Sequence, residues 1–175
     1  MPHTQQREFI NGQLFAMTLA ATAQRSNLYT EKLTDAQRKP FQDSLRADLE
    51  KISREYEITV SDDQHVKNIQ DLSDKLSMKH AALLQSGKMK FGHAQKALNL
   101  YLKYLWCLGD NLTPPHCPID SIVLRRIPKH TEVRWTKLDS PVQYSAIIMV
   151  AKAEANKLGL SIPEWELQIY NSRAA

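Results

Sequence analysis

Residues 91–109 have the sequence Phe-Gly-His-Ala-Gln-Lys-Ala-Leu-Asn-Leu-Tyr-Leu-Lys-Tyr-Leu-Trp-Cys-Leu-Gly. The apolar side chains recur every three or four positions, which predicts a helix from about residue 93 to residue 108 that ends at Gly109. They form a wide apolar stripe, which is typical of a helix whose face is buried: Ala97, Leu98, Tyr101, Leu102, Leu105 and Trp106.

Helices are also predicted on both sides of this stretch. Helical spacing extends over residues 5–24, and Ser140 followed by Pro141 is a typical helix start. Three pairs have the spacing of a capping box: Thr34 with Gln37, Ser61 with Gln64, and Ser161 with Glu164. The second of these boxes predicts a helix that continues, with or without a break, to Leu84. A short helix is expected over residues 118–127.

The sequence therefore predicts one all-α domain, residues 1–175, with six to eight helices. We expect N-terminal helices in residues 1–85, a basic hairpin with a candidate site in residues 86–137, and C-terminal helices in residues 138–175. Helix topology cannot be derived from the pattern.

Composition narrows the class of protein. Of the 175 residues, 42% are apolar and 24% are charged, which is ordinary for a globular domain and excludes a mostly disordered chain. No apolar run approaches the ~18 residues of a membrane-spanning helix. Two cysteines, Cys107 and Cys117, are too few for a secreted disulfide scaffold. We expect a reduced, cytoplasmic protein without a membrane partner, and the oligomeric state stays open.

Charge is concentrated in one part of the chain. The formal net charge is +4, yet residues 86–137 hold nine Lys or Arg and three acidic residues, a net +6, which leaves −2 for the rest. Such a distribution is typical of a surface that faces a polyanion, and nucleic acid is the commonest partner. A solvated face without a partner explains the same charges.

Two segments hold the candidate functional residues. Residues 87–96 form a glycine-bounded turn before a helix, so the helix N-terminus could bind phosphate beside Lys88 and Lys90. The alternative is an ordinary loop with solubilising lysines. In residues 115–126, Asp120 falls in the first turn of a helix, where a carboxylate is also favoured simply as a cap.

In chain order these segments are Gly92-His93-Ala94-Gln95-Lys96-Ala97-Leu98-Asn99, a helix closing at Gly109, and Pro118-Ile119-Asp120-Ser121-Ile122-Val123-Leu124-Arg125-Arg126-Ile127. Over residues 87–127 the chain resembles the helix-hairpin-helix DNA glycosylase superfamily. The resemblance implies an all-α fold, places Lys96 at the nucleophilic lysine of bifunctional members, and places Asp120 at the catalytic aspartate. It also implies that Arg125 or Arg126 is the arginine that follows.

The sequence departs from the family pattern at several points. The hairpin reads Gly-Lys-Met-Lys-Phe-Gly where the family has Leu-Pro-Gly-hydrophobic-Gly, and Ser121-Ile122 replaces Thr-His. The four-cysteine iron–sulfur loop of some members is absent, so we expect no cofactor and no metal.

If the resemblance holds, the protein binds duplex DNA and excises a base that has left the stack. Asp120 would stabilise positive charge on the sugar or activate water, and Lys96 could form a Schiff base. The residues expected to contact DNA are Lys88, Lys90, Gly92, His93, Asn99, Arg125, Arg126 and Trp135. Of these, Trp135 could stack on a base.

Other functions stay open. The main alternative is a non-enzymatic all-α module that binds protein. An RNA-binding or RNA-cutting protein would use the cluster from Arg125 to His130. Cys107, His116, Cys117 and His130 contain suitable atoms for zinc, but their spacing does not match the usual pattern.

Overall fold

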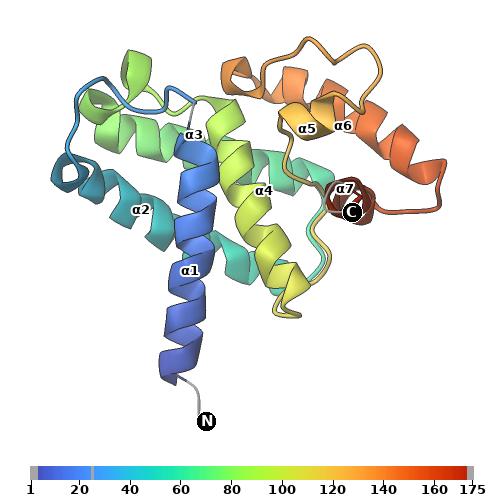
Figure 1. Ribbon diagram of the computed structural model, residues 1–175, viewed down its shortest axis with the longest axis horizontal. Helices are drawn as coiled ribbons and strands as arrows, with labels where there is room; N and C mark the ends of the chain where they lie inside the picture. The colour runs from blue at the N-terminus through green and yellow to red at the C-terminus, as the bar shows by residue number, and fades with distance from the viewer. Residues whose placement is uncertain (1–3, 25, 173–175) are drawn as a thin grey trace.

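Helix α4 (Phe91–Cys107) is the central element of the computed structural model, which describes residues 4–24 and 26–172 (Figure 1). Every residue of α4 as far as Lys103 is buried, including its polar side chains. Helix α1 (Thr4–Ala23) packs along one side of α4 and α3 (Asp62–His80) along another. The stripe predicted from the sequence is therefore part of a helix that is buried on every face from Phe91 to Lys103, whereas Trp106 at the end of the stripe is half-buried.

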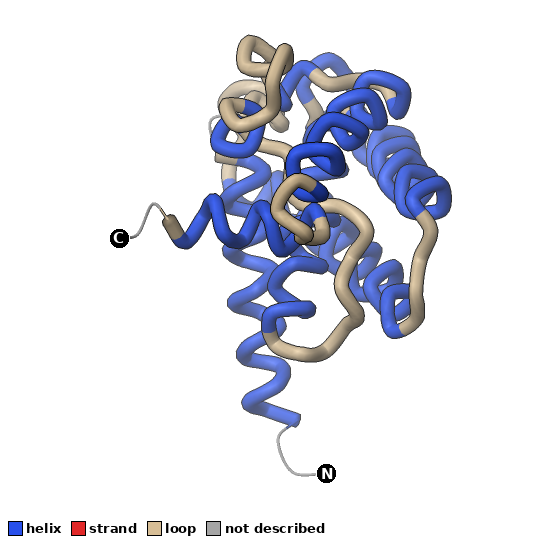
Figure 2. Tube along the Cα trace, turned by 90° about the vertical axis from the view of Figure 1, so that its right-hand side faces the viewer, coloured by secondary structure: helices blue, strands red, loops and turns tan. Residues whose placement is uncertain are grey.

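The other helices surround this centre. They are α2 (Asp35–Ser53), α5 (Ser121–Leu124), α6 (Pro141–Asn156) and α7 (Ile162–Asn171), with short 3-10 turns at Arg54–Glu57, Ala81–Leu83, Gln85–Gly87 and Trp135–Lys137. No β-strand occurs in residues 4–24 and 26–172, so the predicted all-α class and the predicted number of helices are confirmed. Figure 2 shows α7 pointing away from the remaining helices.

Helix starts follow the capping signals in the sequence. The side chains of Thr34, Ser61, Ser140 and Ser161 each accept a hydrogen bond from the backbone N–H three residues later. The reciprocal bond of a full capping box forms at Thr34 and Ser161. At Ser61 it does not form, and the Gln64 side chain is instead turned toward Asn68, to which its Nε2 donates at 2.7 Å.

One predicted helix has the break that the sequence allowed before Leu84, since a 3-10 turn at Ala81–Leu83 follows α3, and a second is shorter than the sequence predicts. Helix α3 ends at His80, because the backbone that follows bonds to an earlier loop: Thr30 N–H donates to the Leu83 carbonyl at 3.0 Å, and Gln85 N–H donates to the Leu28 carbonyl at 3.0 Å. Helix α5 is a single turn rather than a helix over residues 118–127. The residues after α5 instead form the exposed loop that lies beside the candidate site.

In the described part of the chain, none of the helices combines the length and the apolar character needed to cross a bilayer.

Candidate active site

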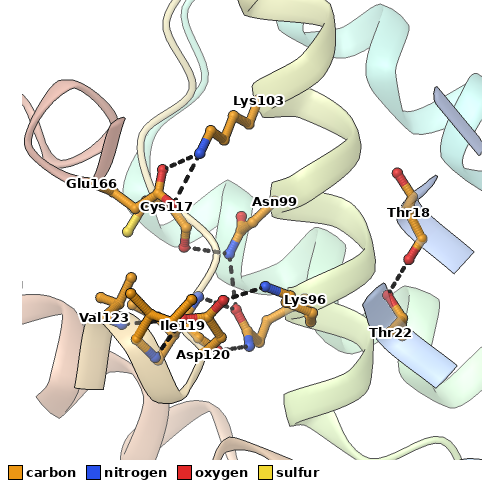
Figure 3. Close-up of polar contacts among 12 residues, drawn as sticks. Thr18, Thr22, Lys96, Asn99, Lys103, Cys117, Ile119, Asp120, Val123 and Glu166 are labelled. Carbon is orange, nitrogen blue, oxygen red and sulfur yellow. Dashed lines mark hydrogen bonds and ion pairs between the residues drawn. The ribbon is translucent and has the colours of Figure 1, made fainter. Parts of the chain in front are cut away.

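The two residues predicted to be catalytic lie next to each other. Lys96 Nζ lies 2.6 Å from Asp120 Oδ2, although the residues are 24 positions apart in the sequence (Figure 3). Both side chains are largely buried, with 8% and 17% of their surface exposed. The ion pair joins the first half of α4 to the N-terminus of α5.

Asp120 is also the N-cap of α5. Its Oδ1 atom accepts hydrogen bonds from the backbone N–H groups of Ile122 at 2.9 Å and Val123 at 3.1 Å. Asp120 therefore acts as a helix cap and as a member of the ion pair at the same time, since each role uses a different carboxylate oxygen. Asp120 is fixed in position by three hydrogen bonds.

A side chain on α4 holds the segment that carries Asp120. Gln95 Nε2 donates to the Ile119 carbonyl at 2.7 Å, and Ile119 N–H donates to Gln95 Oε1 at 3.1 Å. Asn99 Nδ2 donates to the Cys117 carbonyl at 3.0 Å. Because Gln95 precedes Lys96 directly, the same turn of α4 positions both members of the ion pair. We call these contacts the Gln95 clamp.

Several interactions act on the pKa of Asp120. Burial alone would raise this pKa. The positive charge and hydrogen bond of Lys96, together with the two backbone N–H donors on α5, outweigh the burial and hold the pKa of Asp120 below its usual value. This arrangement suits a carboxylate that stays ionised and stabilises positive charge beside it.

The ion pair lines a cavity of about 650 Å³ between α1, α4, α7 and the loop around α5. Its walls combine aromatic, apolar and charged groups, among them Lys96, Leu100, Lys103, Tyr104, Pro118, Asp120, Ile122, Trp135, Glu166 and Tyr170. Trp135, which the sequence singled out for base stacking, is half-buried on this wall, with its ring edge-on to His93 at 5.8 Å. A cavity of this size and lining can accept a flat aromatic ligand.

A second ion pair lines the same cavity, and sequence reasoning missed it. Lys103 Nζ lies 3.0 Å from Glu166 Oε1 and 2.7 Å from Oε2, and both side chains are at least nine-tenths buried (Figure 3). Burial raises the pKa of Glu166 more than the Lys103 ammonium lowers it. Lys103 follows Lys96 by seven residues on α4, which places both on one helix face. Nothing in the sequence pairs α7 with that face.

The N-terminus of α4 is not the phosphate site expected from the sequence. Gly92 N–H donates to the Leu138 carbonyl at 2.9 Å, and the Gly92 Cα packs against the backbone of Trp135. His93 is buried, and its Nε2 lies 3.0 Å from the Ser26 carbonyl. Lys88 pairs with Asp139 at 2.6 Å. The loop through Trp135 packs against this helix end, and the N–H groups of Gly92, His93 and Ala94 already donate to backbone carbonyls rather than to a phosphate.

Asn99, which the sequence placed among the DNA contacts, lies in the core. It belongs to a buried hydrogen-bond network in which His65 Nε2 lies 2.7 Å from Asn99 Oδ1 and Asn99 Nδ2 donates to the Tyr144 hydroxyl at 3.0 Å. The network continues through the Tyr56 hydroxyl to Asn68 on one side and reaches His116 through the Tyr144 hydroxyl on the other. The burial of Gly92, His93 and Asn99 removes these three residues from any DNA-facing surface.

Exposed cationic side chains are concentrated in a loop beside the cavity, which we call the basic loop. We use this term for residues 123–134, together with Lys137; the chain leaves the cavity wall at Ile122 and returns to it at Trp135. Its five cationic residues are all exposed, and no described carboxylate lies within 4 Å of them: Arg125, Arg126, Lys129, Arg134 and Lys137. Lys90 is half-buried at the N-cap of α4.

The residues considered for zinc do not form a cluster. Cys107 is exposed near one end of α4, whereas Cys117 is buried, and burial raises the pKa of its thiol. Within residues 4–24 and 26–172, no group of three or more His, Cys, Asp or Glu side chains is placed to hold a metal ion.

No protein-family model matches this chain, and comparison with curated proteins and with solved structures finds no significant match. The function therefore has to be inferred from the chemistry of the cavity and the surface around it.

Proposed function

We propose that this protein binds duplex DNA, accepts a flipped base in the cavity lined by Lys96 and Asp120, and cleaves the N-glycosidic bond of that nucleotide. The observation that carries this proposal is the 2.6 Å pair of Lys96 and Asp120 on the wall of a cavity of about 650 Å³. The sequence resemblance to helix-hairpin-helix DNA glycosylases selects the same two residues.

The charge distribution supports a base inside and a phosphate backbone outside. The cavity holds two cations and two carboxylates in matched pairs, Lys96 with Asp120 and Lys103 with Glu166, so its formal charge is balanced. The basic loop at its edge carries five exposed cations and only one acid, Glu132. A nucleobase is neutral, whereas each phosphate carries a negative charge. Contacts between cationic side chains and phosphates do not depend on the base sequence.

The proposed step is hydrolysis at the sugar C1′ atom. The oxygen of a water molecule bonds to C1′ as the bond between C1′ and the base nitrogen breaks. The bonding electron pair leaves with the base, which takes up a proton, while the attacking water loses one. The Asp120 carboxylate stabilises the positive charge that develops on the sugar, and its lowered pKa keeps it ionised for this role.

A covalent route would use the Lys96 amine in place of water. In the ion pair, all four bonds of Nζ are occupied, so the ammonium must first give up a proton before its lone pair can bond to C1′. The base then leaves with the bonding electron pair and takes up the proton that the ammonium lost. The C1′–O4′ bond breaks as a second proton passes from Nζ to O4′, and this ring opening gives a protonated Schiff base between C1′ and Nζ. Reduction with borohydride traps that intermediate and thereby distinguishes the two routes.

The test of the proposal is base release from a panel of duplex oligonucleotides, each carrying one damaged or mismatched base. We expect Asp120→Asn to lower the rate at least 100-fold. Lys96→Met should lower it similarly, and it should abolish borohydride trapping if the route is covalent. Lys67→Met is the matched control, because Lys67 pairs with a carboxylate on the exposed face of α3. Circular dichroism checks that each variant folds.

The proposal is contradicted if the wild-type protein releases no base from the panel, or if both site variants release base at the wild-type rate.

DNA binding is tested through its dependence on salt. Each neutralised phosphate contributes about −0.9 to the slope of log affinity against log salt concentration. We expect Arg134→Ala with Lys137→Ala to make the slope shallower by roughly 2, with binding weakened on all sequences alike. Replacing Lys39 and Lys67 on α2 and α3 by alanine should leave the slope unchanged. Binding that does not depend on salt would contradict a DNA partner.

A second candidate function, the non-enzymatic protein-interaction module, is favoured by the surface of α1. Phe9 is 64% exposed and Met17 is 44% exposed on the helix whose N-terminal half extends beyond the other elements (Figure 1). Sedimentation velocity of the wild-type protein and of the Phe9→Ser variant, each at several concentrations, tests this candidate. A sedimentation coefficient that does not depend on concentration or on Phe9 argues against self-association through α1.

A further inference from the structure

The Lys103–Glu166 ion pair is incomplete as a structural element. Both side chains are nine-tenths buried, yet among the described residues Lys103 alone donates a hydrogen bond to the Glu166 side chain, and there its Oε2 atom accepts none with acceptable geometry. Asp120, in the same cavity, has hydrogen bonds to both carboxylate oxygens. A buried carboxylate with unused lone pairs costs free energy that further donors would recover.

The position of this pair suggests what could supply those donors. Lys103 and Glu166 line the cavity that also contains Lys96 and Asp120. On α4, Lys103 is two turns from Lys96 and lies on the same face. If Lys96 and Asp120 act at the sugar, the second pair faces the part of the ligand that lies farther along α4, toward Cys107.

We infer that Lys103 and Glu166 recognise the hydrogen-bonding edge of the flipped base, and that this base carries a guanine-type edge. The inference rests on the proposed function, since it assumes that a nucleobase enters the cavity. Glu166 would accept from the two adjacent N–H donors of such a base, and Lys103 would donate to its neighbouring carbonyl oxygen.

The donor and acceptor inventory separates guanine from the other bases. An ionised carboxylate only accepts, through two oxygens, and an ammonium only donates. Guanine presents two neighbouring donors, N1–H and the N2 amino group, next to the O6 acceptor, so it satisfies both residues at once. The edge of adenine and that of cytosine offer a single donor group, and uracil places a second carbonyl against the carboxylate. Each of these leaves Glu166 short of a donor.

The aromatic residues near the pair fit a flat ligand. The Tyr170 ring centroid lies 4.7 Å from Lys103 Nζ, and Tyr104 and Trp135 line the same cavity. Tyr170 is 53% exposed, so its ring has a free surface on which a base can stack. The ammonium is thereby held between a carboxylate and a ring, with a donor left for the ligand.

The experiment measures binding of free nucleosides to the full chain by isothermal titration calorimetry. We expect guanosine to bind at least tenfold more tightly than adenosine, cytidine or uridine, with inosine intermediate because it lacks the N2 amino group. Glu166→Gln should weaken guanosine binding at least tenfold. Glu154→Gln on α6, a carboxylate outside the cavity, is the matched control and should bind guanosine like the wild type.

A second variant separates recognition from folding. Lys103→Met combined with Glu166→Leu replaces the ion pair by apolar groups of similar size, a change that usually leaves a protein folded. We expect this double variant to keep the wild-type thermal transition and to lose the preference for guanosine. Guanosine binding at wild-type strength in the double variant, or no preference among nucleosides in the wild type, overturns the inference.

The outcomes also distinguish this inference from the proposed function. Nucleoside preference that depends on Lys103 and Glu166, without base release from any DNA, would support the inference while contradicting the glycosylase proposal. Base release whose preference is unchanged in the double variant would support the proposal while overturning the inference.

Discussion

At the scale of single residues, Gly92 shows why a side chain is excluded from one position of α4. An added Cβ at this position would collide with the Trp135 carbonyl oxygen and would lie 3.3 Å from the Leu138 Cβ. The Gly92 N–H also donates to the Leu138 carbonyl. The residue that the sequence assigned to phosphate binding therefore serves as the contact between α4 and the loop that ends at Leu138.

Gly92→Ala should destabilise the protein because the added methyl group must push the backbone of Trp135 away from α4. We expect a loss of about 1–3 kcal/mol in the free energy of unfolding, the range typical of overpacking in a core. Chemical denaturation monitored by circular dichroism measures this loss. Gly12→Ala is the control, since no atom lies within 4 Å of a Cβ added there; equal stability of the two variants would show that the contact does not matter.

At the scale of elements, the sequence predicts most of the helices because their signals are local. Caps such as Thr34 and Ser161, and the apolar spacing of α4, depend only on neighbouring residues. Contacts between distant segments leave no local signal. The loop that covers the start of α4 and the Glu166 partner of Lys103 are of this kind, so the sequence could suggest Lys96 and Asp120 but could not exclude Gly92, His93 or Asn99.

The Gln95 clamp is the contact between elements on which the candidate site depends most. Gln95→Leu would leave the buried N–H and carbonyl groups of Ile119 without partners, at about 1–3 kcal/mol for each group. We expect a corresponding loss of stability in urea denaturation. For the proposed base release we expect a loss well beyond it, since Asp120 would no longer be held against Lys96. Gln13→Leu, on the exposed face of α1, controls for the added apolar group. Wild-type base release by Gln95→Leu would show that the clamp does not position Asp120.

At the scale of the whole molecule, the core is held together by polar as well as apolar contacts. His65 on α3 contacts the Tyr56 hydroxyl at 2.6 Å and Asn99 on α4 at 2.7 Å, with no exposed surface. Desolvation and, to a smaller extent, the nearby His116 lower the pKa of His65 to about 3, although the Asn99 hydrogen bond acts in the opposite direction. The folded state therefore requires a neutral imidazole at this position.

This requirement makes the stability of the protein sensitive to acid. Because the folded-state pKa lies below the unfolded value of about 6.5, the unfolded state binds an additional proton between pH 6.5 and pH 3. The contribution of His65 is fully present above pH 6.5 and falls by about 1.4 kcal/mol per pH unit as the pH drops through this window. His65→Gln should lower the free energy of unfolding at pH 7. It should also reduce the slope of that free energy against pH by the amount that corresponds to about one bound proton. Urea denaturation from pH 7 to pH 4 measures both effects; an unchanged slope would assign the acid sensitivity to other groups.

The spacing of the two lysines on α4 has a consequence for how the protein can vary. Seven residues correspond to nearly two complete turns, about 10 Å of rise, so the helix fixes the distance between the two ion pairs that line the cavity. Side chains at either end can be exchanged without moving the other. An inserted residue between them would rotate one lysine about 100° around the helix axis and out of the cavity. The length of this segment is therefore far less adjustable than its composition.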